Sequence, residues 1–189
     1  ENNEILLRGK TITTGYYKKP EATAAAIDRD GWFHTGDAGY LKDSHLYLTE
    51  RIKDLFKTSN GKYISPQALE TKLAIDRYID QIAVIADERK FVSALIVPVY
   101  GFVKDYAKEK GIAYSNMDEL LQHPKIQALF RARIDTLQQQ FAHYEQVKRF
   151  TLLTEPFSME RGELTNTLKL KRSVVAKNYK GLIDKMYEE

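Results

Sequence analysis

Two basic clusters in this 189-residue chain have residue types and spacing that suit chemistry on a substrate carrying phosphate or carboxylate groups. Arg51 and Lys53 stand two residues apart, and Lys169 follows a Thr-rich polar segment and precedes Lys171 and Arg172. A guanidinium offers paired donors to such oxygens, and an ammonium can offset negative charge that builds up in a reaction. A solvated cluster of surface charges explains the same residues without any chemistry.

A carboxylate with a distinctive setting lies upstream, at Asp37 in the segment Thr35-Gly36-Asp37, which we expect between two strands. An aspartate fixed there can accept hydrogen bonds from the vicinal hydroxyls of a ribose. A glycine turn with a solvated aspartate is the simpler interpretation of these residues alone.

The clearest local signal is the pair Asn60-Gly61, which predicts a β-hairpin because both residues tolerate positive φ. Ser65 is a good N-cap, and Pro66 suits the first position of a helix because its missing N–H would have no partner there. We therefore expect strand, glycine turn and strand, followed by a capped helix over residues 66–75.

The elements that must position these residues predict an α+β fold, with a small antiparallel sheet packed against helices. Periodicity and propensity predict strands at 5–9, 32–34, 37–41, 46–48, 79–86, 91–99 and 148–153. Helices are expected at 20–27, 66–75, 101–110, 116–122, 124–145 and 171–187. In the last two helices the apolar stripes are Ile126, Phe130, Ile134, Leu137, Phe141 and Tyr144, and Val175, Tyr179, Leu182 and Met186.

The composition excludes several classes of protein. A hydrophobic content of 43% with 29% charged residues is typical of a globular protein, and no run approaches the roughly 18 apolar residues of a membrane span. The absence of cysteine excludes disulfides, thiolate metal sites and cysteine nucleophiles, and the four dispersed histidines predict no metal site. A net charge of +3 is too small to predict nucleic-acid binding.

Four motifs, in this order along the chain, resemble the carboxyl-terminal part of AMP-forming acyl-CoA synthetases, a superfamily that also holds luciferases and peptide-synthetase adenylation domains. They occupy residues 32–37, 50–55, 60–66 and 163–172, and the resemblance runs from residue 4 to the last helix. The ending Leu-Thr-x-Thr-Leu-Lys-Leu-Lys-Arg is most similar to the long-chain fatty acid branch. One departure is Leu168, which stands where many relatives have glycine, although that branch commonly has leucine there.

The resemblance implies a role for each matching residue. Asp37 corresponds to the ribose-binding aspartate, Arg51 to an arginine that reaches the nucleotide, and Lys53 to the position of a hinge. Gly61 and Lys62 belong to the loop that lines the passage for the pantetheine arm of coenzyme A.

Lys169 matches the catalytic lysine, whose ammonium would bridge the substrate carboxylate and the α-phosphate of ATP. Residues 1–51 would then be the last piece of the large amino-terminal domain, and residues 52–189 a mobile carboxyl-terminal lid domain. We expect an excised part of a larger enzyme that is inactive alone, because the phosphate loop, the adenine pocket and the acyl tunnel of the family would lie upstream.

The implied activity is that of a long-chain fatty acid–CoA ligase, which forms acyl-AMP and then the CoA thioester, with rotation of the lid between the steps. Its substrates would be a fatty acid, ATP and CoA, with Mg²⁺ held mostly by the missing domain. A cytoplasmic location is expected, and a peripheral membrane contact of the larger enzyme is left open. The alternatives are an adenylate-forming enzyme of another branch, such as a carrier-protein loader or a luciferase-like oxygenase, and a non-catalytic interaction module.

Overall fold

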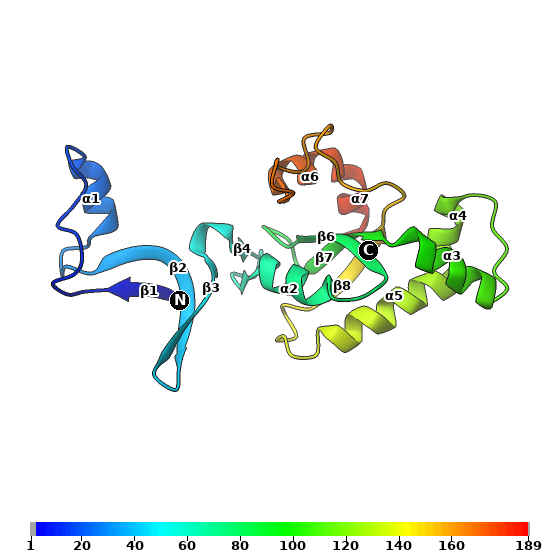
Figure 1. Ribbon diagram of the computed structural model, residues 1–189, viewed down its shortest axis with the longest axis horizontal. Coiled ribbons are helices and arrows are strands. Elements are labelled where there is room, and N and C mark those ends of the chain that lie inside the picture. The colour runs from blue at the N-terminus through cyan, green and yellow to red at the C-terminus, as the bar shows by residue number, and fades with distance from the viewer. Residues whose placement is uncertain (1–2, 189) are drawn as a thin grey trace. The chain divides into compact units, whose positions relative to one another are not determined.

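The computed structural model describes residues 3–188, without the side chain of Glu50. The chain divides into two compact units, Glu1–Leu55 and Phe56–Glu189, whose helices and strands are labelled in Figure 1. This division lies close to the expected domain boundary at residue 52. The assignment of the first unit to a larger domain stays a prediction.

The first unit is built on a three-stranded antiparallel sheet in the order β1-β2-β3. Its strands are β1 (Glu4–Leu7), β2 (Phe33–Lys42) and β3 (His45–Arg51), and it also contains α1 (Pro20–Ala26) and the 3-10 turn η1 (Ile52–Asp54). Several large apolar side chains of the β2–β3 hairpin are exposed, among them Tyr40 and Tyr47, whose rings stack at 5.2 Å between centroids.

The expectation of two separate strands around Thr35-Gly36-Asp37 is wrong, because β2 runs through this segment without a break. The pairing with β1 shifts register here, and Gly36 adopts a positive φ of 71°. The side chain of Thr35 donates a hydrogen bond to the carbonyl of Ile5 (2.8 Å), and the N–H of Gly36 donates to the Glu4 carboxylate (3.0 Å). These contacts replace ladder bonds, so the strand can bulge and continue.

The second unit contains a three-stranded sheet in the order β6-β7-β8, formed by β6 (Ile79–Ile85), β7 (Val92–Pro98) and β8 (Val147–Leu152). The predicted antiparallel pairing of the first two strands is confirmed. The third strand runs parallel to β7, so the sheet is mixed and not wholly antiparallel. A parallel return needs a long crossover, which α3 (Tyr100–Glu109), α4 (Met117–Gln122) and α5 (Pro124–Leu137) provide.

Helices cover both faces of this sheet, as Figure 1 shows. One face packs against α2 (Pro66–Leu73) and the helices of the crossover, and the other packs against α6 (Arg172–Asn178) and α7 (Lys180–Lys185). Alternate residues of β7 serve the two cores, since Ala94 and Ile96 face the first and Leu95 and Val97 face the second, all fully buried. Each buried Leu or Ile contributes about 1.5–3 kcal/mol to stability. The predicted α+β class is confirmed.

The predicted hairpin and capped helix are present. Strand β4 (Phe56–Lys57) pairs antiparallel with β5 (Tyr63–Ile64), and the Ser65 hydroxyl accepts a hydrogen bond from the N–H of Ala68 (3.3 Å) at the start of α2. Only Gly61 of the Asn-Gly pair has a positive φ (75°), and its N–H donates to the carbonyl of Thr58 (2.8 Å). The loop is therefore longer than a two-residue Asn-Gly turn, with glycine in its left-handed position.

Helix α5 ends at Leu137, so the expected continuation to residue 145 is wrong. The cause is Gln138, whose buried amide accepts a hydrogen bond from the N–H of Val147 (2.8 Å) and donates to the carbonyl of the same residue (3.4 Å). These bonds fix the chain where it turns into β8. Tyr144, expected in the buried stripe, is exposed, whereas Ile126, Phe130 and Ile134 are buried.

The single final helix expected at residues 171–187 is wrong as well, because a break at Tyr179 separates α6 from α7. After this break Ile183 occupies the core in place of Leu182, which is exposed. Gly181, with its low helix propensity, lies just after the break. None of the helices in residues 3–188 is long and apolar enough to cross a membrane.

Gln138 provides a test of this packing, because it is followed by a second glutamine that is exposed. We expect Gln138→Ala to lower the free energy of unfolding of the chain by about 1–3 kcal/mol, since the buried N–H of Val147 loses its acceptor. The matched control Gln139→Ala should change it by less than about 0.5 kcal/mol. Urea denaturation of both variants measures the difference, and equal values would contradict this role for Gln138.

Candidate active-site residues

Asp37 and Arg51, both predicted to bind a nucleotide, are brought together in the first unit. They face each other on β2 and β3, and the Arg51 Nε lies 3.2 Å from Oδ1 of Asp37. The side chains are partly open to solvent, with 33% of Asp37 and 62% of Arg51 exposed. An exposed pair like this contributes only about 0–1 kcal/mol to stability, so its value to the protein need not be structural.

The backbone that carries Asp37 is held by its neighbours. The N–H of Asp37 donates to the hydroxyl of Thr35 (3.1 Å), which in turn bonds to β1. His34 lies in the same bulge and contacts the carboxylates of Glu4 (3.1 Å) and Asp28 (3.7 Å). The hydrogen bond to Glu4 raises the pKa of His34 above its ordinary value. A network of paired charges therefore supports the segment that presents Asp37.

Lys53, the predicted hinge residue, lies in η1 at the end of the first unit. Its side chain is exposed. The backbone is extended at Arg51 on one side of this short turn (ψ 135°) and at Leu55 on the other (ψ 138°). A polar residue in such a segment can change its backbone angles without exposing apolar surface.

Gly61 and Lys62 lie in the loop between β4 and β5 of the second unit, and both are exposed. A Cβ added at Gly61 would meet no atom within 4 Å, so the glycine is required here by its positive φ and not by crowding within the chain. The Lys62 ammonium lies 5.6 Å from the centre of the Tyr144 ring.

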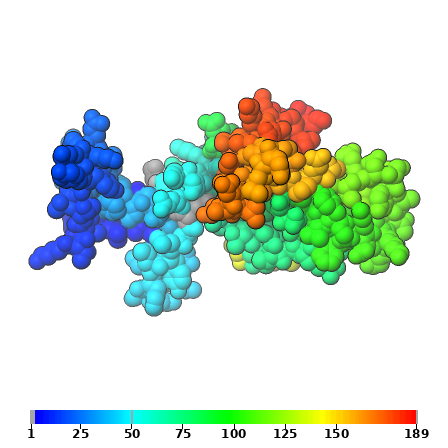
Figure 2. Space-filling view, turned by 45° about the horizontal axis from the view of Figure 1, so that its top comes forward, coloured from blue at the N-terminus to red at the C-terminus, as the bar shows by residue number. Residues whose placement is uncertain are grey.

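Lys169 is exposed and lies in the segment between β8 and α6. Figure 2 shows this segment, mostly in orange, at the surface of its unit. Its backbone is tied on both sides to Thr165. The Lys169 N–H donates to the Thr165 hydroxyl (3.0 Å), and the Thr165 N–H donates to the Lys169 carbonyl (2.8 Å). Leu164 and Leu170 form a β-bridge beside them. The lysine therefore projects from a small closed loop with a fixed backbone.

Leu168 adopts a left-handed conformation with φ 59°, which branched residues rarely populate. Its N–H donates to the carbonyl of Thr165 (2.9 Å), which closes a turn, and 68% of the residue is exposed. The conformation gives a physical reason for the glycine that many sequences of the resembled family carry here.

Glu163 is a residue that the sequence reasoning missed. It is fully buried, and its carboxylate accepts hydrogen bonds from the Arg161 guanidinium (3.1 and 3.2 Å), the Asn178 amide (3.1 Å) and the Ser158 N–H (3.0 Å). Burial acts to raise the pKa of Glu163, but these hydrogen bonds outweigh it and hold the pKa below its ordinary value. A glutamate in a polar segment gives no sequence signal of burial.

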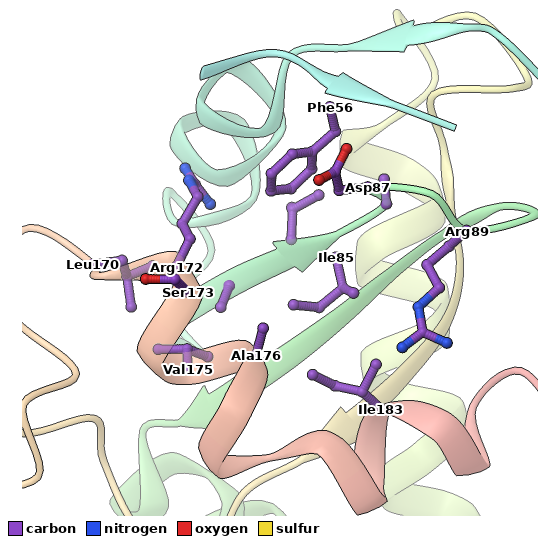
Figure 3. A pocket seen from close by; sticks show the side chains of 13 residues that line it. Phe56, Ile85, Asp87, Arg89, Leu170, Arg172, Ser173, Val175, Ala176 and Ile183 are labelled. Atoms are coloured by element: carbon purple, nitrogen blue, oxygen red, sulfur yellow. The ribbon is translucent and has the colours of Figure 1, made fainter. Parts of the chain in front are cut away.

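A cavity of about 320 Å³ lies beside the segment that carries Lys169. It is lined mainly by apolar side chains, among them Phe56, Ile85 and Val175, as Figure 3 shows. Arg172 also lines it, with its guanidinium paired to both oxygens of Glu70 (2.5 and 2.7 Å). Lys169, Gly61 and Lys62 are not among its lining residues.

The candidate residues thus fall into two groups. Asp37, Arg51 and Lys53 belong to the first unit, and Gly61, Lys62 and Lys169 to the second. The first unit offers a carboxylate that can accept from hydroxyls and a guanidinium that can donate to phosphates, and the second unit offers two ammonium groups that suit phosphates. Over residues 3–188, no cluster of three His, Cys, Asp or Glu side chains could hold a metal ion.

Comparison with known proteins identifies the family. The family model of the AMP-binding enzyme C-terminal domain matches residues 53–189. Long chain acyl-CoA synthetase 7 of Arabidopsis thaliana, a peroxisomal protein, is 37% identical over 98% of this chain, and long-chain-fatty-acid–CoA ligase 5 of Rattus norvegicus is 36% identical over 98%. The chain covers 27% and 28% of these two proteins. The adenylation domain of a carboxylate reductase from Mycobacterium chelonae matches 98% of this chain and 28% of its own, with a TM-score of 0.70 and 27% identity.

The conformation of Leu168 leads to a stability test. We expect Leu168→Gly to stabilise the chain by about 0.5–1 kcal/mol, because relief of about 1–2 kcal/mol of left-handed strain exceeds the extra entropy that glycine loses on folding. Leu168→Ala keeps the strain and is the matched control. Urea denaturation compares the two, and a lower stability of the glycine variant would show that position 168 is not strained.

Proposed function

The chain belongs to the family of AMP-binding enzyme C-terminal domains, and from this premise we propose that it is the carboxyl-terminal part of a long-chain fatty acid–CoA ligase. The observation that carries this proposal is the 36–37% identity with long-chain synthetases over 98% of the chain. The larger enzyme, called the parent enzyme below, activates a fatty acid with ATP and transfers the acyl group to CoA. The chain alone forms no acyl-AMP, because it spans about a quarter of the length of these relatives.

In the first step the fatty carboxylate attacks the α-phosphate of ATP, which gives acyl-AMP and pyrophosphate. Asp37 accepts hydrogen bonds from the ribose hydroxyls, and Arg51, its neighbour at 3.2 Å, donates to the nucleotide. Lys169 lies between the carboxylate and the phosphate, where its ammonium balances the charge that accumulates during the attack. The fixed backbone around Lys169 supports this role, since a preorganised charge needs no rearrangement as the reaction proceeds.

In the second step the carboxyl-terminal lid, residues 52–189, turns about Lys53, which withdraws Lys169 from the nucleotide. The loop of Gly61 and Lys62 then lines the passage of the pantetheine arm. The CoA thiol attacks the acyl carbonyl of the acyl-adenylate, which forms the thioester and releases AMP. The exposure of Lys53 and the open space around Gly61 support this motion and this contact. Residues 1–51 act as the last piece of the large amino-terminal domain.

ATP, CoA and the fatty acid are the proposed substrates of the parent enzyme, and Mg²⁺ accompanies ATP. The ion is held mostly by the large amino-terminal domain of the parent enzyme, which is the main partner of this chain. We place the parent enzyme in the cytoplasm, with a peripheral contact to a membrane as an open question. Nucleic acid is not a proposed partner.

A second candidate is an adenylate-forming enzyme with another acceptor in its second step, such as a carrier protein. The match to the adenylation domain of a carboxylate reductase favours it, although its identity of 27% is lower than that of the long-chain synthetases. Supplying the parent enzyme with ATP and palmitate together with either CoA or a carrier protein separates the two candidates. Faster AMP release with the carrier protein would favour the second.

Substitutions in the parent enzyme separate the two half-reactions. Lys169→Ala should reduce acyl-AMP formation by about 10²- to 10³-fold, because one well-placed charge is lost from the transition state. Conversion of supplied acyl-AMP and CoA should stay near normal. Gly61→Leu should have the opposite effect, so that acyl-AMP accumulates without thioester. Each half-reaction is measured separately, by pyrophosphate release and by thioester formation.

Matched controls separate these effects from damage to the fold. Lys171→Ala removes a neighbouring exposed ammonium, and Gly111→Leu places the same side chain at another glycine with positive φ and open surroundings. Both controls should leave the rates of the two half-reactions near normal. Gly111→Leu introduces the same backbone strain as Gly61→Leu, so it shows how much of any loss comes from strain alone. Equal loss of both half-reactions in folded Lys169 and Gly61 variants would overturn the two-orientation mechanism.

A further inference from the structure

A buried carboxylate lies under the loop that carries Lys169. Glu163 has no exposed surface. Its carboxylate accepts hydrogen bonds from a guanidinium, an amide and a backbone N–H. We propose that Glu163 is a positioning residue for adenylation, which acts by holding the loop that presents Lys169. This inference rests on the catalytic role proposed for Lys169.

The chemistry of burial explains why Glu163 can fix the loop. A buried carboxylate is costly to the fold unless it is paired and hydrogen-bonded, and loss of one partner from such a pair is strongly destabilising. The donors to Glu163 come from both sides of the loop. Ser158 and Arg161 precede it, and Asn178 belongs to α6, which follows it. The carboxylate therefore ties the two ends of the loop to one point.

The backbone of Glu163 continues this connection toward the lysine. The carbonyl of Glu163 accepts a hydrogen bond from the N–H of Lys171 (2.8 Å). The next pair along the two segments is the β-bridge between Leu164 and Leu170. The pair after that is Thr165 and Lys169, which are joined by two hydrogen bonds. These contacts form a short ladder with Glu163 at its base, so a displacement of the base moves Lys169.

Other contacts of the same segment fix the position of the ladder on its unit. The Phe157 N–H donates to the side-chain carbonyl of Gln81 on β6 (2.6 Å), and Arg161 also donates to the carbonyl of Pro156. The Arg161 guanidinium lies 3.2 Å from Glu155 as well. Because the segment before Glu163 is anchored to the sheet, the carboxylate links Lys169 to the core and not only to a surface loop.

The experiment uses the parent enzyme and three variants. Glu163→Gln keeps the size of the side chain but sets an amide NH₂ against donors. Asn178→Ala removes one donor from an exposed position and leaves the carboxylate with Arg161 and Ser158. Asp76→Asn is the matched control, because Asp76 is also buried and bonded to an arginine, Arg133 (2.7 and 2.8 Å). It lies in the turn between α2 and β6, far from the loop in sequence.

We expect Glu163→Gln to lower kcat for acyl-AMP formation by about 10- to 100-fold, since a displacement of about 1 Å can cost that much. The KM for ATP should change by less than about twofold, because the loss lies in the transition state and not in ground-state binding. Asn178→Ala should lower the same kcat by about 3- to 10-fold, because it removes one hydrogen bond to a charged group and the bond comes from an exposed side chain. The rate of conversion of supplied acyl-AMP to thioester should stay within about twofold of the unmodified enzyme in both variants. In Asp76→Asn the ratio of the rates of the two half-reactions should be unchanged.

Each outcome of this experiment supports or overturns the positioning role. Selective loss of adenylation in the Glu163 and Asn178 variants, with the control unaffected in this ratio, supports the positioning role. If either variant loses both half-reactions in proportion to a fall in Tm, as a merely structural residue would, or if Asn178→Ala has no effect, the inference is overturned. Lys169→Ala is run beside them, because a normal rate of adenylation in that variant overturns the proposed function itself. Loss in Lys169→Ala without loss in Glu163→Gln overturns only the role of Glu163.

Discussion

The presentation of Lys169 depends on one interaction, the satisfaction of the buried Glu163 carboxylate by Arg161, Asn178 and Ser158. A charge without exposed surface is tolerable only when such donors surround it. This requirement closes the segment between β8 and α6, which is rich in polar residues and would otherwise be free to move. An exposed lysine thereby gains a defined backbone position, which catalysis by a preorganised charge needs.

Local chemistry made much of the second unit predictable. The Asn60-Gly61 hairpin and the Ser65 cap follow from the conformations and hydrogen bonds that single residues prefer, and the pairing of β6 with β7 follows from β-branched runs joined by a short polar turn. The candidate residues were assigned from the resemblance of their motifs to a known family, and the close pairing of Asp37 with Arg51 is a geometry that this resemblance did not predict.

Several of the errors share a cause, which is dependence on contacts outside the segment itself. Helix α5 ends at Leu137 because Gln138 bonds to Val147, and β2 continues through Gly36 because Glu4 and Ile5 satisfy its polar groups. The burial of Glu163 depends on Asn178 in the same way. Periodicity within one segment carries no information about such partners, so sequence patterns could not place these features.

The proposed mechanism requires that Lys169 reaches the phosphates of ATP. An ATP derivative with an acyl phosphate transfers its acyl group to lysines beside the bound phosphates, and mass spectrometry of the labelled parent enzyme identifies them. We expect labelling of Lys169 that excess ATP prevents, while Lys171 and Lys62, also exposed, react slowly and without protection. Labelling of Lys169 that ATP does not prevent, or protected labelling only at other lysines, would show that Lys169 does not lie beside the phosphates.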